Sequence, residues 1–410
     1  MSDYGRLTVQ ITPLIDSGGD IDSDDFLEPE QVFDVEVTHP LNEGRSAKAS
    51  LSMEDPLVED LRPWQQGLRI KYHRPGEVNN DEPVFWGQAN VIDDFENGRV
   101  TLEAVDPSVR MQHHYVRIGD DALNDPADNQ RGRIYPDYRG IDLLVDAAQA
   151  APGYPVLGCV VEDVDSIEDT QKIDVERGQE VWQMILDICA QDTGPDFDMA
   201  TKVGPGAGPG VYATLRLYER LGSDLSTTVK FDYGDDEDWD TPTNDNAPSI
   251  VVTPGHPTTH VHVVDTDRSW RVTGFTPDYA EEHGMWVDWV ATDWKIKDSL
   301  DVNVLKQYAK AHIKAYGIPP KQTEIRLRLD SGAVFFYGDP GWPDGNTVGD
   351  FYIGDSVKVR AKRGYREVNK KYRITQVVLS QPGARGPMQT QLTLIPSDVD
   401  IDVTLDVDET

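Results

Sequence analysis

Three histidines, His256, His260 and His262, have the spacing that comes closest to a metal site. On a strand, His260 and His262 would share a face, and two imidazoles on one face can chelate zinc. His256 instead follows Pro254-Gly255 and precedes Pro257, which is typical of a turn, and no nearby acidic or cysteine residue has ligand spacing. Hydrogen-bonded or exposed histidines explain the pattern more simply, so we predict no metal and no cofactor.

The acidic segment from Asp20 to Asp24 resembles the start of a calcium-binding loop. In an EF-hand the sixth position is Gly and the twelfth is Glu. Here those positions are Asp25 and Gln31, so the pattern fails at both.

Motifs for nucleophilic or phosphate chemistry are absent from the sequence. There is no Gly-x-Ser-x-Gly elbow, and neither Cys159 nor Cys189 has a local catalytic signature. The glycines between Gly204 and Gly210 alternate with prolines, which lack the amide donors that a phosphate-binding loop needs. Carboxylate pairs are too common at this composition to indicate a glycosidase. We therefore predict no catalytic residues and a protein that is not an enzyme.

The chain is strongly acidic. Its 410 residues carry 38 Lys and Arg against 73 Asp and Glu, a formal net charge of -35. Such a field repels nucleic acid and anionic membranes, and the nine Trp, 16 Tyr and 10 Phe argue against a disordered acidic chain. One interpretation is an ordinary solvated acidic surface, and the other is a surface to which passing DNA must not adhere.

Other features argue against a membrane-spanning or secreted protein. No apolar run approaches the roughly 18 residues that a membrane helix needs, and mean hydropathy is -0.52. The N-terminal MSDYGRLTVQ lacks the pattern of a signal peptide, and two cysteines fit synthesis in a reducing cytosol.

Apolar and polar residues alternate with the period of a strand in six short segments of the first 105 residues, which is typical of an antiparallel barrel or sandwich. Helical spacing then follows at 141–148 and 181–189, around a short apolar strand at 156–161. A third helix is predicted over 299–316, and further strands follow it. These patterns predict an α+β fold that is mostly β.

The strands repeat in a similar order. A Gly67-led strand precedes strands at 86–91 and 100–104, and a strand led by Gly354-Asp355 precedes strands at 372–378 and 391–394. Chance similarity between two β meanders is the alternative. If the repeat is real, the chain holds two related antiparallel β-barrel-like tube domains, an inserted small α/β domain and an additional peripheral region. The boundaries we expect are 1–117 for the first tube domain, 118–200 for the insertion, 201–298 for a second β region, and 299–410 for the helix and strands that complete the second tube domain.

Two surface features stand out near the C-terminus. A predicted hairpin tip around Gly364-Tyr365 gathers seven basic residues, which suggest either an exposed turn or a contact with the acidic surface of a neighbouring copy. They are Arg360, Lys362, Arg363, Arg366, Lys370, Lys371 and Arg373. The final segment, 398–408, alternates apolar and anionic residues, so we expect a strand whose apolar face packs on its own domain or on another subunit, rather than a disordered tail.

Several short segments follow one another in a characteristic order. The order is a strand with small residues, a Gly-led strand, an apolar-Trp-Gly strand, and a strand that ends in Asp. The segments are Ser46–Pro56, Gly67–Ile70, Val84–Gly87, Gly98–Pro107, Gly178 with Val181-Trp182, and Gly354–Val357. Together they resemble the hub proteins at the tail tip of long-tailed bacteriophages. The likeness covers most of the chain through scattered matches rather than one signature.

This resemblance implies a structural virion component rather than an enzyme. It implies a homotrimeric hub that closes or extends the tail tube, adapts six-fold to three-fold symmetry and lets DNA pass during ejection. The implied partners are the distal tail protein, the tape-measure protein and tail-tip or fibre proteins, with no stable membrane insertion. The implied location is the virion tail tip, after synthesis in the host cytoplasm. Many such hubs carry a C-terminal lysozyme, peptidase or fibre region, and this chain ends soon after its β region, so digestion of the host wall is not expected.

Two alternatives remain at this stage. Trp270, Trp286, Trp289 and Trp294 would suit a carbohydrate-binding host-adhesion module, although such residues also fill cores. The His256–His262 cluster would suit a metal-dependent cell-wall hydrolase.

Overall fold

The structure is a computed structural model of the 410-residue chain. The residues it describes are 6–12, 26–73, 83–115, 131–134, 140–142, 144–145, 159–165, 173–176, 178–190, 194–203, 211–233, 247, 249–254, 260–264, 270–275, 288–291, 302–316, 321–328, 335, 337–338, 350–383, 386–397 and 404–409.

The first six strands form one antiparallel unit, which we call unit 1. In space they lie in the order β1-β4-β5-β6-β3-β2. Their apolar residues alternate and bury one face, as the sequence predicted. The strands are β1 (Arg6–Ile11), β2 (Val32–Pro40), β3 (Ser46–Ser52), β4 (Gln66–His73), β5 (Pro83–Asp94) and β6 (Arg99–Val105), with a short 3-10 helix η2 (Pro56–Asp60) between β3 and β4.

Six later strands form a second unit, unit 2, which has the same order. They lie as β12-β18-β19-β20-β17-β13, so that in both units the strands, numbered along the chain, follow the order 1-4-5-6-3-2. One pairing differs in direction, because β1 is antiparallel to β4 whereas β12 is parallel to β18. The strands are β12 (Lys230–Tyr233), β13 (Ser249–Pro254), β17 (Lys321–Arg328), β18 (Ser356–Arg363), β19 (Arg366–Pro382) and β20 (Gln389–Pro396).

Hydrogen bonds also support the correspondence between the strands of units 1 and 2. In each unit they join the segment just before the fourth strand to the fifth strand, a place that we call the corner. In unit 1 the amide of Trp64 donates to the Ala89 carbonyl, and the side chain of Gln88 donates to the Trp64 carbonyl. In unit 2 the amide of Gly354 donates to the Ile374 carbonyl, and Arg373 donates to the Gly354 carbonyl. Trp64 and Gly354 both have a left-handed backbone. The two corners are therefore built alike, with no similarity of side chains.

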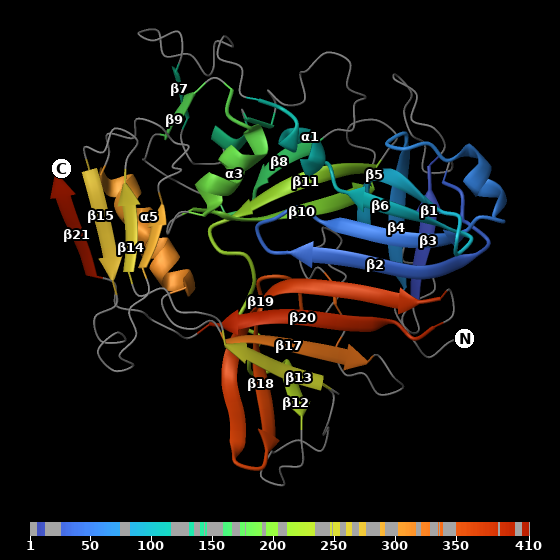
Figure 1. The fold of residues 1–410 in the computed structure, drawn as a ribbon. Coiled ribbons are helices and arrows are strands. Elements are labelled where there is room, and N and C mark those ends of the chain that lie inside the picture. The colour runs from blue at the N-terminus through green and yellow to red at the C-terminus, as the bar shows by residue number, and fades with distance from the viewer. Residues whose placement is uncertain are drawn as a thin grey trace.

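Strand β19 joins the two units into one 12-stranded sheet. One edge of β19 pairs with β18 over residues 366–373 and then with β2 of unit 1 over residues 376–382. The change of partner falls at a β-bulge at Thr375. Figure 1 shows β19 lying beside β2 where the two units meet. The buried residues of both units form one continuous hydrophobic cluster.

A smaller α/β unit lies against this junction. It has a three-stranded sheet in the order β10-β11-β8, where β11 pairs antiparallel with β10 and parallel with β8. Helix α3 presents Trp182, Ile185 and Ile188 to the core, as its spacing predicted. The elements are β8 (Cys159–Asp163), α3 (Val181–Cys189), β10 (Asp196–Val203) and β11 (Val211–Tyr218), with α1 (Ser108–Gln112) and the pair β7 (Arg131–Ile134) and β9 (Ile173–Glu176) nearby in Figure 1.

A peripheral layer holds the last strand of the chain. Helix α5 packs on a sheet in the order β16-β14-β15-β21. Strand β21 is antiparallel to β15, and its Leu405 and Val407 pack on the second hydrophobic cluster. We predicted that the apolar face of the segment 398–408 packs on its own domain or on another subunit. The described part, residues 404–409, packs on its own chain. The elements are β14 (His260–Val264), β15 (Trp270–Phe275), β16 (Asp288–Ala291), α5 (Val302–Tyr316) and β21 (Thr404–Glu409).

The predicted fold class, α+β and mostly β, is confirmed, as is the hairpin around Gly364-Tyr365. The strands of the described residues form open sheets rather than a closed barrel, because β12 and β13, like β1 and β2, end the strand order unpaired with each other. The four domain boundaries stay a prediction.

Two glycines touch where β19 changes partner. Gly222 has φ +98°, and a Cβ added to it would lie 2.2 Å from the Gly354 carbonyl carbon. Gly364 at the hairpin tip has φ +60° and open space around it. We expect Gly222→Ala to lower the free energy of unfolding by about 3 kcal/mol, because a backbone clash adds to the left-handed strain of about 1 kcal/mol that Gly364→Ala alone would cause. Thermal and denaturant unfolding of both variants measure this, and equal losses would contradict the close packing.

Candidate functional site

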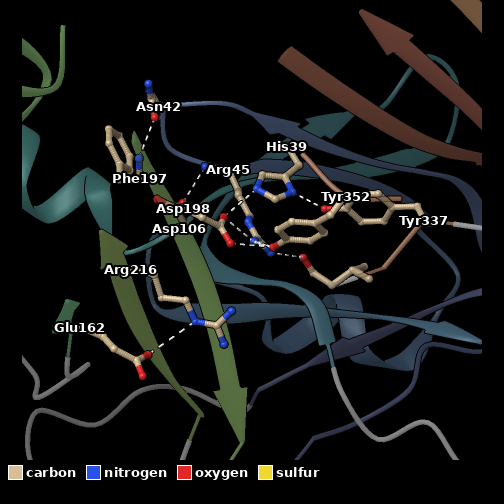
Figure 2. Close-up of polar contacts among 11 residues, drawn as sticks. His39, Asn42, Arg45, Asp106, Glu162, Phe197, Asp198, Arg216, Tyr337 and Tyr352 are labelled. Atoms are coloured by element: carbon tan, nitrogen blue, oxygen red, sulfur yellow. Dashed lines mark hydrogen bonds and ion pairs between the residues drawn. The ribbon is translucent and has the colours of Figure 1, made fainter. Parts of the chain in front are cut away.

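Strand β10 presents two carboxylates to the junction of the β units. It begins Asp196-Phe197-Asp198, and alternate residues of a strand point to opposite faces. Phe197 therefore turns away and packs edge-on against Trp182 of α3, with ring centroids 5.5 Å apart. Asp198 faces units 1 and 2 (Figure 2). Asp196 also bonds residues of both units.

Asp198 binds residues from both units. Its Oδ1 lies 2.7 Å from His39 Nε2, at the end of β2, and 2.6 Å from Arg45 Nη2, just before β3. Its Oδ2 accepts a 2.6 Å hydrogen bond from the Tyr352 hydroxyl of unit 2. The other nitrogen of His39 contacts the Tyr337 hydroxyl. Asp198 thus connects strand β10 of the α/β unit to both unit 1 and unit 2.

Asp196 repeats the arrangement two residues earlier. Its Oδ1 accepts a 2.8 Å hydrogen bond from Asn42, and its Oδ2 accepts from Arg373 and from the Leu221 amide at 2.9 Å. Asn42 in turn accepts a 2.7 Å bond from the Phe197 amide. We call the whole set the carboxylate joint. Its members are His39, Asn42, Arg45, Asp196, Asp198, Tyr352 and Arg373.

The charges at the centre of the joint stabilise each other. Burial alone would raise the pKa of Asp198, but the charges of Arg45 and His39 and the bonds from His39 and Tyr352 hold that pKa well below its usual range. Burial alone would likewise lower the pKa of Arg45, and Asp198 raises it instead. Asp198 and Arg45 are therefore both ionised inside the protein. Removing either one leaves the other charge buried without a partner, which strongly lowers the free energy of unfolding.

Asp106 contacts the backbone of Arg45, and its pKa is shifted in the opposite direction to that of Asp198. Its carboxylate accepts hydrogen bonds from the amides of Arg45 and Ser108. Desolvation nevertheless dominates, and it raises the pKa of Asp106 to about 6. The buried carboxylate thus takes up a proton near neutral pH.

The geometry of the joint suits mechanical fixation rather than catalysis. The Asp198 side chain has no solvent exposure, and those of His39 and Arg45 are almost as buried, so a substrate has no access to them. The sequence alone did not reveal the joint, since members that bond each other directly are up to 307 residues apart. The one local signal was two acidic residues flanking an aromatic residue at the start of a strand that continues with Met199 and Ala200.

The described residues include only some of the histidines and tryptophans that the sequence singled out. His260 and His262 stack on β14 with ring centroids 6.5 Å apart, and His262 bonds Thr273. No described group of three His, Cys, Asp or Glu could hold a metal. His256, the acidic loop 20–24 and two of the four tryptophans, Trp286 and Trp294, lie outside the described residues, whereas Trp270 is in β15 and Trp289 in β16.

At least four of the seven basic residues near the hairpin contact other residues of the chain, among them Arg363, which donates a 3.4 Å hydrogen bond to the Tyr233 hydroxyl. Arg360 forms a two-point contact with buried Asp232. Lys371 pairs with Asp224 at 2.8 Å, and Arg373 belongs to the carboxylate joint. Part of the positive charge of the hairpin is therefore neutralised within the chain. The two interpretations of the hairpin, an exposed turn or a contact with a neighbouring copy, both stay predictions.

Comparison with known proteins shows the fold. No family model and no curated protein matches the sequence. Two solved structures resemble the chain over nearly their whole length. A tail protein from Neisseria meningitidis MC58 is 12% identical, with a TM-score of 0.56 over 96% of this chain and 97% of that one. The 43 kDa tail protein of prophage MuSo2 from Shewanella oneidensis is 10% identical, with a TM-score of 0.52 over 95% and 98%.

The chain therefore has the fold of phage tail proteins, and the resemblance predicted from the sequence is confirmed at that level. In the described part of the chain, no helix is long and apolar enough to cross a membrane.

Removing the charge of Asp198 tests the joint. Asp198→Asn leaves Arg45 buried without its counter-charge, and we expect the free energy of unfolding to fall by about 3–5 kcal/mol. Asp60→Asn, at an exposed position, is the matched control, with an expected change within about 0.5 kcal/mol. Denaturant unfolding at pH 7 compares the two, and equal effects would refute the joint's contribution.

Asp106 predicts a dependence on pH. Burial raises the pKa of Asp106 from its ordinary value of 3.8 to about 6. The folded state therefore binds the proton more tightly than the unfolded state, and this carboxylate adds stability as pH falls from 7 to 4. Stability of the unmodified chain relative to Asp106→Asn should therefore rise by up to about 3 kcal/mol over that range. Unfolding of both proteins at each pH measures the difference, and a difference that stays constant or falls would contradict the assignment.

Proposed function

We propose that the chain is a structural component of a phage tail, a trimeric hub at the tail tip that closes or extends the tail tube. The observation that carries the proposal is the repeated strand order of units 1 and 2 within one sheet. Three copies would present six similar β units, which suits contact with a six-fold tube on one side and three-fold components on the other.

The carboxylate joint supports this proposal. A hub that bridges two symmetries must hold its two units at one fixed angle, since six units make an even ring only if the angle within a copy equals the angle between copies. Asp196 and Asp198 connect β10 to both units at once. Their buried, charged hydrogen bonds have a narrow range of geometry, which favours a single angle.

The charge of the chain also fits such a role. With a net charge of -35, a channel through the ring would repel the DNA backbone, so DNA would pass without adhering. The partners that follow are the tape-measure protein, the distal tail protein and tail-tip or fibre proteins, and the place of action is the virion tail tip after synthesis in the host cytoplasm. In this proposal the chain acts as a scaffold without catalysis, cofactor or membrane insertion.

The mass of the purified protein tests the proposal. We expect native mass spectrometry and light scattering to give a particle of three times 45.8 kDa over a wide concentration range. A monodisperse monomer at high concentration would overturn the trimeric hub. The glycan-binding and hydrolase alternatives predict no defined trimer.

A further inference from the structure

Strand β13, at one end of the 12-stranded sheet, has an unpaired edge in the described part of the chain. It pairs with β17 on one side, and no described strand lies on the other. Val251 and Val252 are adjacent residues of this strand, with exposed fractions of 48% and 37%. An exposed apolar edge strand tends to pair with another chain.

Among the described strands, β5 of unit 1 provides another edge that is partly unpaired. Its first half, to Ala89, pairs with β4, but residues 90–94 pair with β6 alone among the described strands. Ile92 is 42% exposed there, and Phe95, directly after the strand, is 83% exposed. Asp94 accepts hydrogen bonds from Asn97 in the following turn, so its charge is engaged in that turn.

The chain already contains one junction of this kind. Strand β2, at the end of unit 1, pairs antiparallel with the second half of β19 in unit 2. By strand order, β2 corresponds to β13 and β19 corresponds to β5. The two free edges are therefore the counterparts of the two edges that pair within the chain.

If the two free edges paired with each other, their register would follow from comparing the two units. In each unit, residues directly opposite one another on neighbouring strands form a row across the sheet. In unit 1 the row is Val37, Ala47, Ala104 and Ala89. In unit 2 the row is Val252, Thr323, Leu394 and Ile374. The rows end at Ala89 and Ile374, the two carbonyls that accept the corner amides of Trp64 and Gly354, so two independent observations give one alignment.

This alignment of the two units predicts, from the residue pairs between β2 and β19, which residues of β13 and β5 would lie opposite each other. Val37 pairs with Leu379, and its counterpart Val252 would pair with Asp93 once the bulge at Thr375 is allowed for. The next rung on the same face places Ile250 opposite Phe95. On the other face, Val251 lies diagonal to Ile92, within reach of contact.

We propose that β13 of one copy adds to the free edge of β5, residues 90–94, in a second copy, and so repeats the internal β2–β19 junction between copies. The pairing is head-to-tail, which closes into a ring when the rotation per copy divides a full turn. Added backbone hydrogen bonds supply the affinity, and Val251, Val252, Ile92 and Phe95 become buried. This inference rests on the proposed trimeric hub and names the edges that join its copies.

Engineered cysteines in the full chain test the pairing. Directly opposed residues of antiparallel strands have Cα atoms about 4.5–5.5 Å apart, which suits a disulfide. We expect Asp93→Cys with Val252→Cys to give covalent dimers and trimers on mild oxidation, seen on non-reducing gels. Asp93→Cys with Tyr365→Cys, at the exposed hairpin tip, is the control and should stay monomeric on the gel. The native Cys159 and Cys189 are buried and remain in both.

A second pair of variants measures the affinity without cross-linking. Val251→Asp would place a charge opposite Asp94 in the proposed pairing, so we expect the trimer to dissociate at least tenfold more readily while the thermal midpoint of the monomer is unchanged. Val160→Asp on β8, where the valine is also 48% exposed, is the matched control and should leave the trimer intact.

The outcomes separate this inference from the proposed function. A trimer that is cross-linked by the Asp93–Val252 pair and weakened by Val251→Asp supports both. A trimer that shows neither effect, with Val252→Cys tried against cysteines at 92, 93 and 94, overturns the strand pairing and leaves the hub standing. A monomeric unmodified protein overturns both.

Discussion

The divided pairing of β19 is the constraint on which the rest of the structure depends. One edge of this strand pairs first with β18 of its own unit and then with β2 of the other, and the bulge at Thr375 makes the exchange possible. Because both units share one sheet and one hydrophobic cluster, neither can rotate without breaking backbone hydrogen bonds. The angle between the units is therefore set by backbone hydrogen bonds. These bonds depend little on the identity of the side chains.

The carboxylate joint fixes the same angle from outside the sheet. Asp196 and Asp198 project from β10 to partners in both units, and the buried ion pair of Asp198 with Arg45 tolerates little displacement. A buried ion pair contributes little net stability relative to apolar packing, but it strongly penalises arrangements that leave it incomplete. The joint is therefore better explained by the need for one geometry than by a need for stability or for catalysis.

Much of the fold followed from local pattern. Alternation placed the strands of unit 1 and the final strand β21, and helical spacing placed α3 and α5. The repeat was visible as two glycine-led meanders, because β4-β5-β6 and β18-β19-β20 are each consecutive in the chain. The remaining strands of unit 2 were harder to order, since β12 is separated from β18 by more than 100 residues and is parallel to it. The joint could not be predicted, because contacts such as Arg45 with Tyr352 depend on the tertiary fold alone.

In the proposed trimer, one junction inside the chain is repeated between chains. Electron cryomicroscopy of the purified assembly, reconstructed without imposed symmetry, tests it most directly. The expected result is a ring of three copies in which six β units sit at nearly equal angles, three junctions lying within chains and three between them. Two clearly unequal sets of angles, or contacts between copies that leave β13 and the end of β5 uncovered, would contradict it.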